Sequence, residues 1–308
     1  MRTTERAFFI LRRNYMTLKP ALNYEDQITK LKIDHNLKIK DEVYATEILK
    51  KVNYYRLSGY GIGLKKYNNK EHYKDHITIE HLFNLYCFDS QFKNNLIRTI
   101  EQIEIELRTQ IAYHLAMTYG SDVLMHEDNF IHKTNKKGQT IYSIINENLS
   151  NEVDRQKNKP FVKHHLRKYD GKFPIWVSVE LMSFGNLSSL FSILKDEDQK
   201  VISNYYNTDP KYLKNWILCL VEVRNICAHY TRLYNMPLKE TPRLYSENEQ
   251  YKGKQNKIFP ILLIIKRILN SNDQWESLLK DLENTFNKYQ GYFNYKFMGF
   301  PPNWKDVL

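Results

Sequence analysis

One short run of the chain combines the side chains that metal-free phosphate chemistry uses. Arg224, Asn225 and His229 lie within the run Arg-Asn-Ile-Cys-Ala-His. An imidazole can take and return a proton near neutral pH, and a guanidinium holds phosphate oxygens and stabilises charge on them. RNA carries its own nucleophile, the 2′-hydroxyl, so these groups suffice to cut it. The same residue types near a helix C-terminus also cap carbonyls and complement the helix dipole, which is the alternative interpretation.

The stretch 209–230 that carries these side chains is expected to be a helix with one buried face. Its apolar residues recur at three- or four-residue spacing, namely Leu213, Ile217, Leu220, Val223 and Cys227. On a continuous helix Asn225 and His229 are i,i+4 neighbours, and Arg232 continues the same polar ridge. Arg224 lies about 140° around the axis from His229. The arginine must therefore reach round, the helix must bend, or a second copy of the motif must complete the site.

A second polar ridge interrupts the longest apolar pattern, residues 78–119, which contains neither proline nor glycine. The ridge consists of Arg98, Glu101, Glu104 and Arg108. A single helix of this length would span about 63 Å, so we expect a bend or two helices in series. Surface ion pairs are the simplest interpretation of the ridge. If the ridge faces the 209–230 helix, Glu104 could orient His229 or hold Arg224, with Arg108 in support.

The remaining pattern is helical almost throughout, and the alternation typical of strands is scarce. Helices are expected at 24–33, 41–52, 141–149, 174–184, 188–194, 198–206, 257–269 and 273–289, with Asp41 as an N-cap and Gly185 as a stop. These segments predict an all-α helical bundle with a small N-terminal helical subdomain. The expected organisation is a basic arm at 1–20, the subdomain at 21–75 and the main domain at 76–308, with a basic, poorly organised insertion at about 120–171.

Two aromatic segments lie outside the main helices. Residues 53–64 place three glycines among tyrosines, which predicts a tight turn beneath packed rings. Residues 298–304 include Phe300 and Trp304, and we expect this ending to pack back onto the bundle as an aromatic clamp.

The charge of the chain favours a polyanionic partner. Lysine and arginine number 46 against 35 acidic residues, which gives a net charge of +11 and favours a polyanion such as nucleic acid. The side chains expected to contact RNA are Arg56, Lys133, Lys136, Lys137, Lys163, Arg167, Lys168 and Arg232. Basic residues in loops are equally compatible with plain solvent exposure.

Other function classes find little support in the sequence. The cysteines Cys87, Cys219 and Cys227 lie in apolar stretches without a CxxC pair, which indicates small core residues in a reducing compartment and argues against a zinc site. No metal and no cofactor are expected. No stretch reaches the roughly eighteen apolar residues of a membrane span, so we expect a soluble, cytoplasmic protein with no membrane partner.

Six motifs occur in a fixed order along the chain. They are YEDQI (24–28), NYYRLSGY (53–60), IEIELR (103–108), PIWVSVELMSFGNLS (174–188), VRNICAHYTRLYN (223–235) and MGFPPNW (298–304). Each is short, but together they resemble the Abi-like abortive-infection family of bacteria, of the AbiD/AbiF type. The resemblance covers nearly the whole chain, from Leu18 to Trp304.

That family in turn resembles HEPN nucleases, whose signature is an arginine, often followed by asparagine, and a histidine roughly four to six residues further on. Arg224, Asn225 and His229 fit this signature, although the apolar pair Ile226-Cys227 departs from many HEPN versions. The resemblance implies a metal-independent endoribonuclease of phage defence, a HEPN-type bundle, a homodimer with the site at its interface, and in some members a bound structured non-coding RNA. The alternatives are an RNA-binding defence protein without its own cleavage activity and a purely structural helical scaffold.

Overall fold

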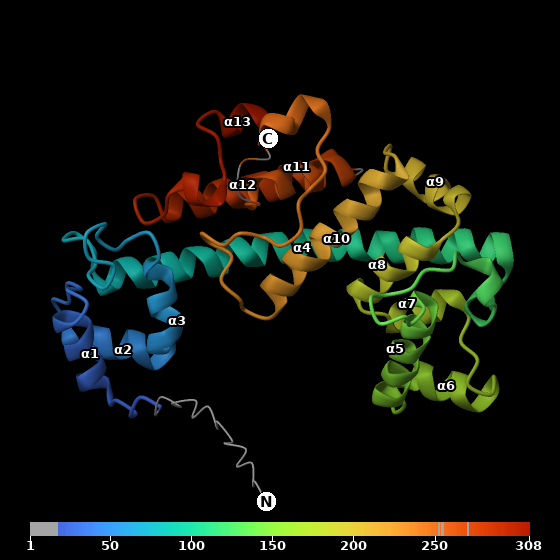
Figure 1. Ribbon diagram of the computed structural model, residues 1–308, viewed down its shortest axis with the longest axis horizontal. Coiled ribbons are helices and arrows are strands. Elements are labelled where there is room, and N and C mark those ends of the chain that lie inside the picture. The colour runs from blue at the N-terminus through green and yellow to red at the C-terminus, as the bar shows by residue number, and fades with distance from the viewer. Residues whose placement is uncertain (1–17, 252, 254–255, 270) are drawn as a thin grey trace, which may run out of the picture. The chain divides into compact units, whose positions relative to one another are not determined.

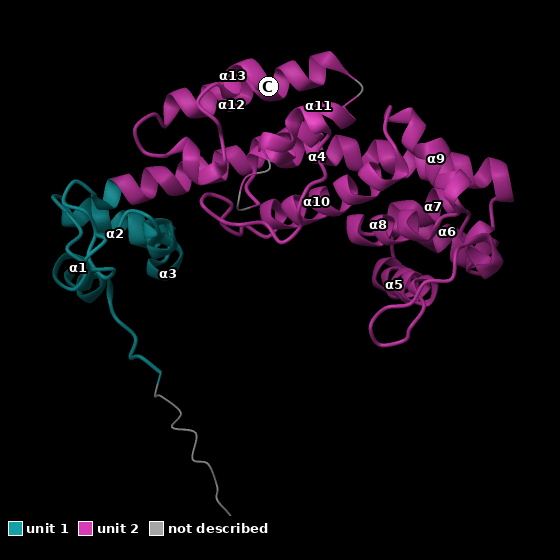
Figure 2. Cartoon of the chain, turned by 45° about the horizontal axis from the view of Figure 1, so that its top comes forward, with its two compact units in different colours: residues 1–80 teal, residues 81–308 magenta. Residues whose placement is uncertain are grey.

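The structure is a computed structural model that describes residues 18–251, 253, 256–269 and 271–308 (Figure 1). The chain forms two compact units, residues 1–80 and 81–308 (Figure 2). Residues 1–17 of the expected basic arm lie outside the described part. Within that part, helices dominate and β-structure is confined to three isolated bridges. The predicted all-α fold class is confirmed.

Unit 1 contains α1 (Tyr24–Ile33), α2 (Glu42–Lys51), α3 (Tyr54–Ser58) and a 3-10 turn, η1 (Gly59–Gly61). The predicted N-cap at Asp41 is confirmed, because its carboxylate accepts the backbone N–H of Tyr44 at 2.9 Å. The tight turn among tyrosines is also confirmed. A Cβ placed on Gly61 would lie 2.5 Å from the hydroxyl of the buried Tyr73, so only glycine fits beneath that ring.

Unit 2 is built around α4 (Ile79–Tyr119), which is one helix of 41 residues (Figure 1). Of the two expected alternatives, a bend or two helices in series, the second does not occur, since the helix is continuous from Ile79 to Tyr119. Its length is about 60 Å. The buried face carries the predicted apolar residues Leu82, Leu85, Phe92, Leu96, Ile100, Ile103, Leu107, Ile111 and Leu115. Burial of this face, rather than helix propensity alone, stabilises a helix of this length.

The segment expected to be a poorly organised insertion is largely helical. It forms the 3-10 turns η2 (Val123–Met125) and η3 (Glu127–Asn129), and the helices α5 (Ile141–Gln156) and α6 (Pro160–Lys168). The expected helix at 141–149 is therefore too short, and the basic residues that follow it lie on a second helix. Helix α5 packs against two later helices, and Val162 on α6 is fully buried. A few apolar anchors order this segment although most of its side chains are polar.

The next four helices are α7 (Ile175–Leu181), α8 (Phe184–Ile193), α9 (Asp196–Tyr205) and α10 (Pro210–Ala228). The prediction of Gly185 as a helix stop is wrong, because this glycine lies in the first turn of α8. The hydroxyl of Ser183 accepts the backbone N–H of Asn186 at 3.1 Å and caps α8, so α7 ends four residues earlier than the glycine. Helix α10 packs against α8, α9 and α11.

The C-terminal part contains η4 (Ser246–Tyr251), α11 (Phe259–Ile268), α12 (Asn272–Lys288), η5 (Tyr295–Met298) and α13 (Trp304–Val307). The expected aromatic clamp is confirmed: the rings of Phe286, Tyr295 and Phe300 all lie within 5.8 Å of the ring of Trp304, measured between centroids. Across the described ranges, none of the helices combines the length and the apolar character that a bilayer crossing demands.

Candidate active site at the end of helix α10

Helix α10 ends at Ala228, two residues before the predicted end. His229 is the C-cap, and Tyr230 turns into the left-handed region with φ of 56°. The N–H of Tyr230 donates to the carbonyl of Cys227 at 3.2 Å, and the N–H of Thr231 donates to that of Ile226 at 3.0 Å. These two bonds form a Schellman motif, which usually has glycine in the place of Tyr230. His229 is therefore an exposed side chain on a well-defined helix end.

The predicted polar ridge does not extend to Arg232. The turn at Tyr230 takes the chain off the helix axis, so the i+3 relation to His229 is lost. The guanidinium of Arg232 instead lies 3.0 Å from the sulfur of Met236. The expectation of three aligned side chains therefore holds only for Asn225 and His229, because residue 232 is outside the helix.

A buried ion pair on α4 fixes the loop that follows the helix. The carboxylate of Asp89 accepts the backbone N–H groups of Leu233 and Tyr234 at 3.2 and 2.7 Å, and lies 3.0 Å from the ammonium of Lys93. Lys93 also donates to the carbonyl of Thr231 at 2.9 Å. Both side chains are almost fully buried, and such a pair is tolerated because its hydrogen-bonding groups are occupied.

Sequence reasoning missed Asp89 and Lys93. The available signal was an acid and a base at i,i+4 on the same side of the helix as the apolar Phe88 and Phe92. Charges in such a position are rarely left without partners, so this pattern is a signal for a buried polar contact to another segment. Which segment this is could not be read from α4 alone.

Two side chains of α10 also bind the backbone of the segment that follows this helix. The carboxylate of Glu222 accepts the backbone N–H groups of Lys239 and Glu240, both at 2.8 Å. The amide oxygen of Asn215 accepts the N–H of Arg243 at 2.7 Å. The segment 231–243 is thus anchored at several points although it contains no helix.

Arg224 is held by the ridge on α4. Its Nε lies 3.5 Å from one carboxylate oxygen of Glu104, and the other oxygen of Glu104 is paired with Arg108. Arg108 also donates to the carbonyl of Val179. Glu104 and Arg108 are buried, whereas the side chain of Arg224 is 32% exposed. Of the two roles considered for Glu104, holding Arg224 is the one seen here.

The side chain of Arg224 lines a polar groove of about 570 Å³, here called the Arg224 groove. Its other polar lining residues are Arg108, Asn148, Asn151, Glu152, Arg155, Gln156, Glu180, Ser183 and Asn186. The amide of Asn148 on α5 donates to that of Asn186 on α8 at 3.0 Å, which links the two walls. Arginine and amide groups in a concave surface suit the phosphates and sugar hydroxyls of a nucleic acid.

His229 is not among the described residues that line the Arg224 groove. Asn225 lies between the two on the sequence, and its amide oxygen accepts a hydrogen bond of 3.4 Å from the guanidinium of Arg224. The divergence of about 140° expected for one helix therefore remains within this chain. For a phosphate bound by Arg224 in the groove, the histidine would have to come from a second copy of the chain, or the helix end would have to move.

The residues expected to contact RNA belong to several elements of the two units. Lys163, Arg167 and Lys168 are exposed on α6, and Lys136 and Lys137 are exposed in the turn before α5. The ammonium of Lys133 lies 3.4 Å from the hydroxyl of Ser192 on α8. Arg56 is exposed on unit 1. The sequence identifies these basic side chains but does not show which of them lie close together in space.

The cysteine inside the motif is a core residue. Cys227 is buried, and burial raises the pKa of its thiol to about 12. Cys219 is buried too, with a pKa raised to about 12 by the same cause. At neutral pH both thiols are protonated, so neither is a nucleophile.

No curated protein and no solved structure matches this chain. The Abi-like protein family matches residues 47–235, which is more than half of the chain. The matched region contains all of α4 and α10, and it ends just after the loop that Asp89 holds. It therefore includes the Arg224–Glu104–Arg108 cluster and His229. The chain belongs to the Abi-like protein family, an assignment that indicates abortive infection, a form of phage defence.

Proposed function

We propose that this protein is an abortive-infection endoribonuclease of the HEPN type, which cuts RNA without a metal ion through Arg224 and His229. One observation carries the proposal: a carboxylate holds Arg224 at the wall of a polar groove, and a well-ordered cap exposes His229 five positions later on the same helix. The family assignment supplies the biological setting.

The proposed reaction needs only groups of the chain and of RNA, together with water. His229 carries one of the two proton transfers, from the ribose 2′-hydroxyl or to the leaving 5′-oxygen, and water carries the other. The 2′-oxygen forms a bond to phosphorus while the bond to the 5′-oxygen breaks, which leaves a 2′,3′-cyclic phosphate and a 5′-hydroxyl. Arg224 binds the phosphate and stabilises the charge that develops on it. The side chain of Asn225, which accepts a hydrogen bond from Arg224, orients the ribose or the imidazole.

The test is cleavage of single-stranded RNA by the purified full-length protein. Because His229 moves the proton, His229→Ala should lower the cleavage rate at least about a hundredfold. His132→Ala is the matched control, since His132 is also exposed and lies in the loop before α5. EDTA should leave the rate of the wild-type protein unchanged. Full activity of His229→Ala, or activity that EDTA removes and a divalent metal restores, would refute the assignment.

A second candidate function is an RNA-binding defence protein that does not cleave. Two observations favour it. The carboxylate of Glu104 already pairs with the positive charge of Arg224, which a bound phosphate would also have to use. His229 is absent from the described lining of the groove. This alternative predicts RNA affinity that falls steeply with salt and no cleavage products. The proposed nuclease predicts the same salt dependence together with cyclic-phosphate products, so the products separate the two.

A further inference from the structure

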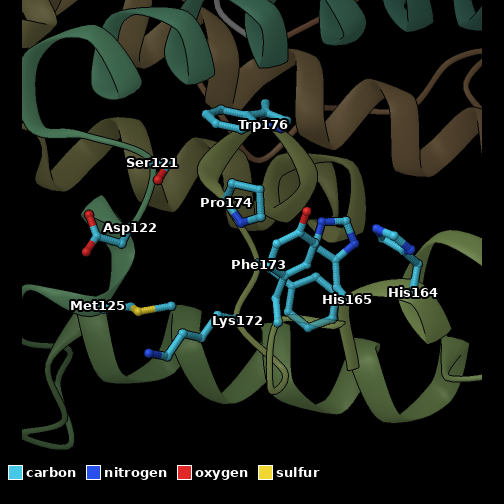
Figure 3. A pocket seen from close by; sticks show the side chains of 10 residues that line it. Ser121, Asp122, Met125, His164, His165, Lys172, Phe173, Pro174 and Trp176 are labelled. Atoms are coloured by element: carbon cyan, nitrogen blue, oxygen red, sulfur yellow. The ribbon is translucent and has the colours of Figure 1, made fainter. Parts of the chain in front are cut away.

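A second cavity, of about 580 Å³, lies at the end of α4 and between α6 and α7 (Figure 3). We call it the His165–Trp176 pocket. Ser121 and Asp122 line one side, His164 and His165 another, and the segment from Lys172 to Trp176 completes it. The pocket is of the size that small-ligand sites have. The roles of Arg224 and His229 proposed above do not use it.

The pocket is built from aromatic rings. The ring of His165 stacks on that of Phe173, with 5.2 Å between centroids and 20° between planes, and Phe173 is buried beneath it. The ring of Tyr169 lies 5.3 Å from that of His165. Trp176 borders the other end of the pocket and is 53% exposed, an unusual state for the largest apolar side chain. Flat faces that remain accessible are suited to stacking on a flat ligand.

Polar groups flank these rings. The carbonyl of Phe161 lies 2.9 Å from Nδ1 of His165, so Nδ1 carries a hydrogen and Nε2 is the ring's second polar atom. Lys172 supplies a positive charge to the wall, and Asp122 supplies a carboxylate. Hydrogen bonding to His126 first, and the charge of Lys172 in addition, lower the pKa of Asp122, so this carboxylate is ionised at neutral pH. The pocket thus offers a cation, a hydrogen-bond acceptor and stacking surfaces.

We propose that the His165–Trp176 pocket binds a nucleotide. The base stacks on the aromatic rings, and Asp122 and Ser121 accept or donate hydrogen bonds at its edge. The phosphate lies near Lys172. Stacking, edge recognition and phosphate pairing are the three interactions by which proteins hold unpaired bases.

Adjoining hollows favour a nucleotide that belongs to single-stranded RNA. Trp176 also lines a neighbouring hollow of about 350 Å³, which shares Arg108 and Glu180 with the Arg224 groove. The three cavities therefore follow one another, from the His165–Trp176 pocket to Arg224. A strand with one base in the pocket can continue over Trp176 towards the groove, whereas a free nucleotide would use the pocket alone.

The test measures binding of two probes to the full-length protein, AMP and a single-stranded 2′-O-methyl oligonucleotide. Neither probe can be cut through a 2′-hydroxyl, so the outcome does not depend on nuclease activity. Trp176 also provides a direct signal, because the other tryptophans, Trp216, Trp275 and Trp304, are buried. A bound base should shield Trp176 and reduce quenching of its fluorescence by acrylamide.

Trp176→Ala should weaken binding about tenfold, the scale of one lost base stack, and Lys172→Glu should weaken it as well. The controls are Tyr67→Ala and Lys200→Glu, which alter an exposed aromatic and an exposed lysine elsewhere and should leave the dissociation constant unchanged. Saturable AMP binding identifies a free-nucleotide site, and binding of the oligonucleotide alone identifies an RNA site. The proposal is overturned if neither probe binds, or if both pocket variants bind as tightly as the controls.

Discussion

At the scale of single residues, Glu104 is the group on which the Arg224 region depends. It is buried, and its two oxygens contact two different arginines, one of which lines the groove and is partly exposed. The carboxylate therefore serves two purposes: it compensates the buried charge of Arg108, and it fixes the guanidinium of Arg224 for the role proposed for it.

Glu104→Gln should lower the free energy of unfolding by about 3 kcal/mol, because it leaves the charge of Arg108 buried without its counter-ion. Urea denaturation of the purified variant measures this. Glu101→Gln is the control, since Glu101 is exposed one turn earlier on the same helix and should change stability by less than about 0.5 kcal/mol. Equal effects of the two substitutions would show that the Glu104 pair does not stabilise the fold.

The buried thiols permit a prediction at the same scale. Burial raises the pKa of Cys219 and Cys227 to about 12, so at pH 8 both are protonated and shielded. Iodoacetamide should therefore leave them unmodified in the folded protein and alkylate both after unfolding in urea. Peptide mass spectrometry reads out each position. Rapid alkylation of Cys227 in the folded state would mean that the end of α10 opens readily.

At the scale of elements, the helix that carries the motif was predictable and its ending was not. The three- and four-residue spacing of Leu213, Ile217 and Leu220 defines the buried face of α10, and that face is buried. The cap could not be predicted because tyrosine stands where such caps favour glycine. The contacts of Asp89 could not be predicted either, because they join residues that are 144 and 145 positions apart in the sequence.

The cap itself can be tested through Tyr230. A left-handed conformation costs a residue with a side chain about 1 kcal/mol or more, and glycine adopts it freely. Tyr230→Gly should therefore be more stable than Tyr230→Ala by about 1 kcal/mol, as both remove the same exposed ring. Urea denaturation compares the two variants. If they are equally stable, the left-handed turn is not a feature of the protein in solution.

At the scale of the whole molecule, the divergence of Arg224 and His229 is the reason to consider a site that two chains would share. Arg224 lines the groove, and His229 is exposed at the helix end. A two-fold pairing that brings one α10 end to the other would combine the arginine of each chain with the histidine of its partner. We propose a homodimer of this kind, and it makes a prediction that a one-chain site does not.

Mixing the inactive variants Arg224→Ala and His229→Ala should restore activity. A mixed dimer with shared sites has one site that lacks both groups and one that is intact, so random pairing returns about a quarter of the wild-type rate. Cleavage of single-stranded RNA after unfolding and refolding the mixture together measures this. A mixture of Arg224→Ala with the double variant is the control, because it contains no intact site. Absence of any recovery would place both groups of a site in one chain.

The hydrogen bonds of Asp89 reduce the conformational entropy that the loop after His229 would lose on binding a substrate. A loop that orders only when substrate arrives must lose its conformational freedom at that moment, which weakens binding and slows the approach to the transition state. The loop after His229 has already lost that freedom on folding, because Asp89 and Lys93 fix it to the longest helix of the protein. The helix end that carries His229 is thus preorganised, and in the proposed ribonuclease the binding energy from RNA would remain available for the reaction itself.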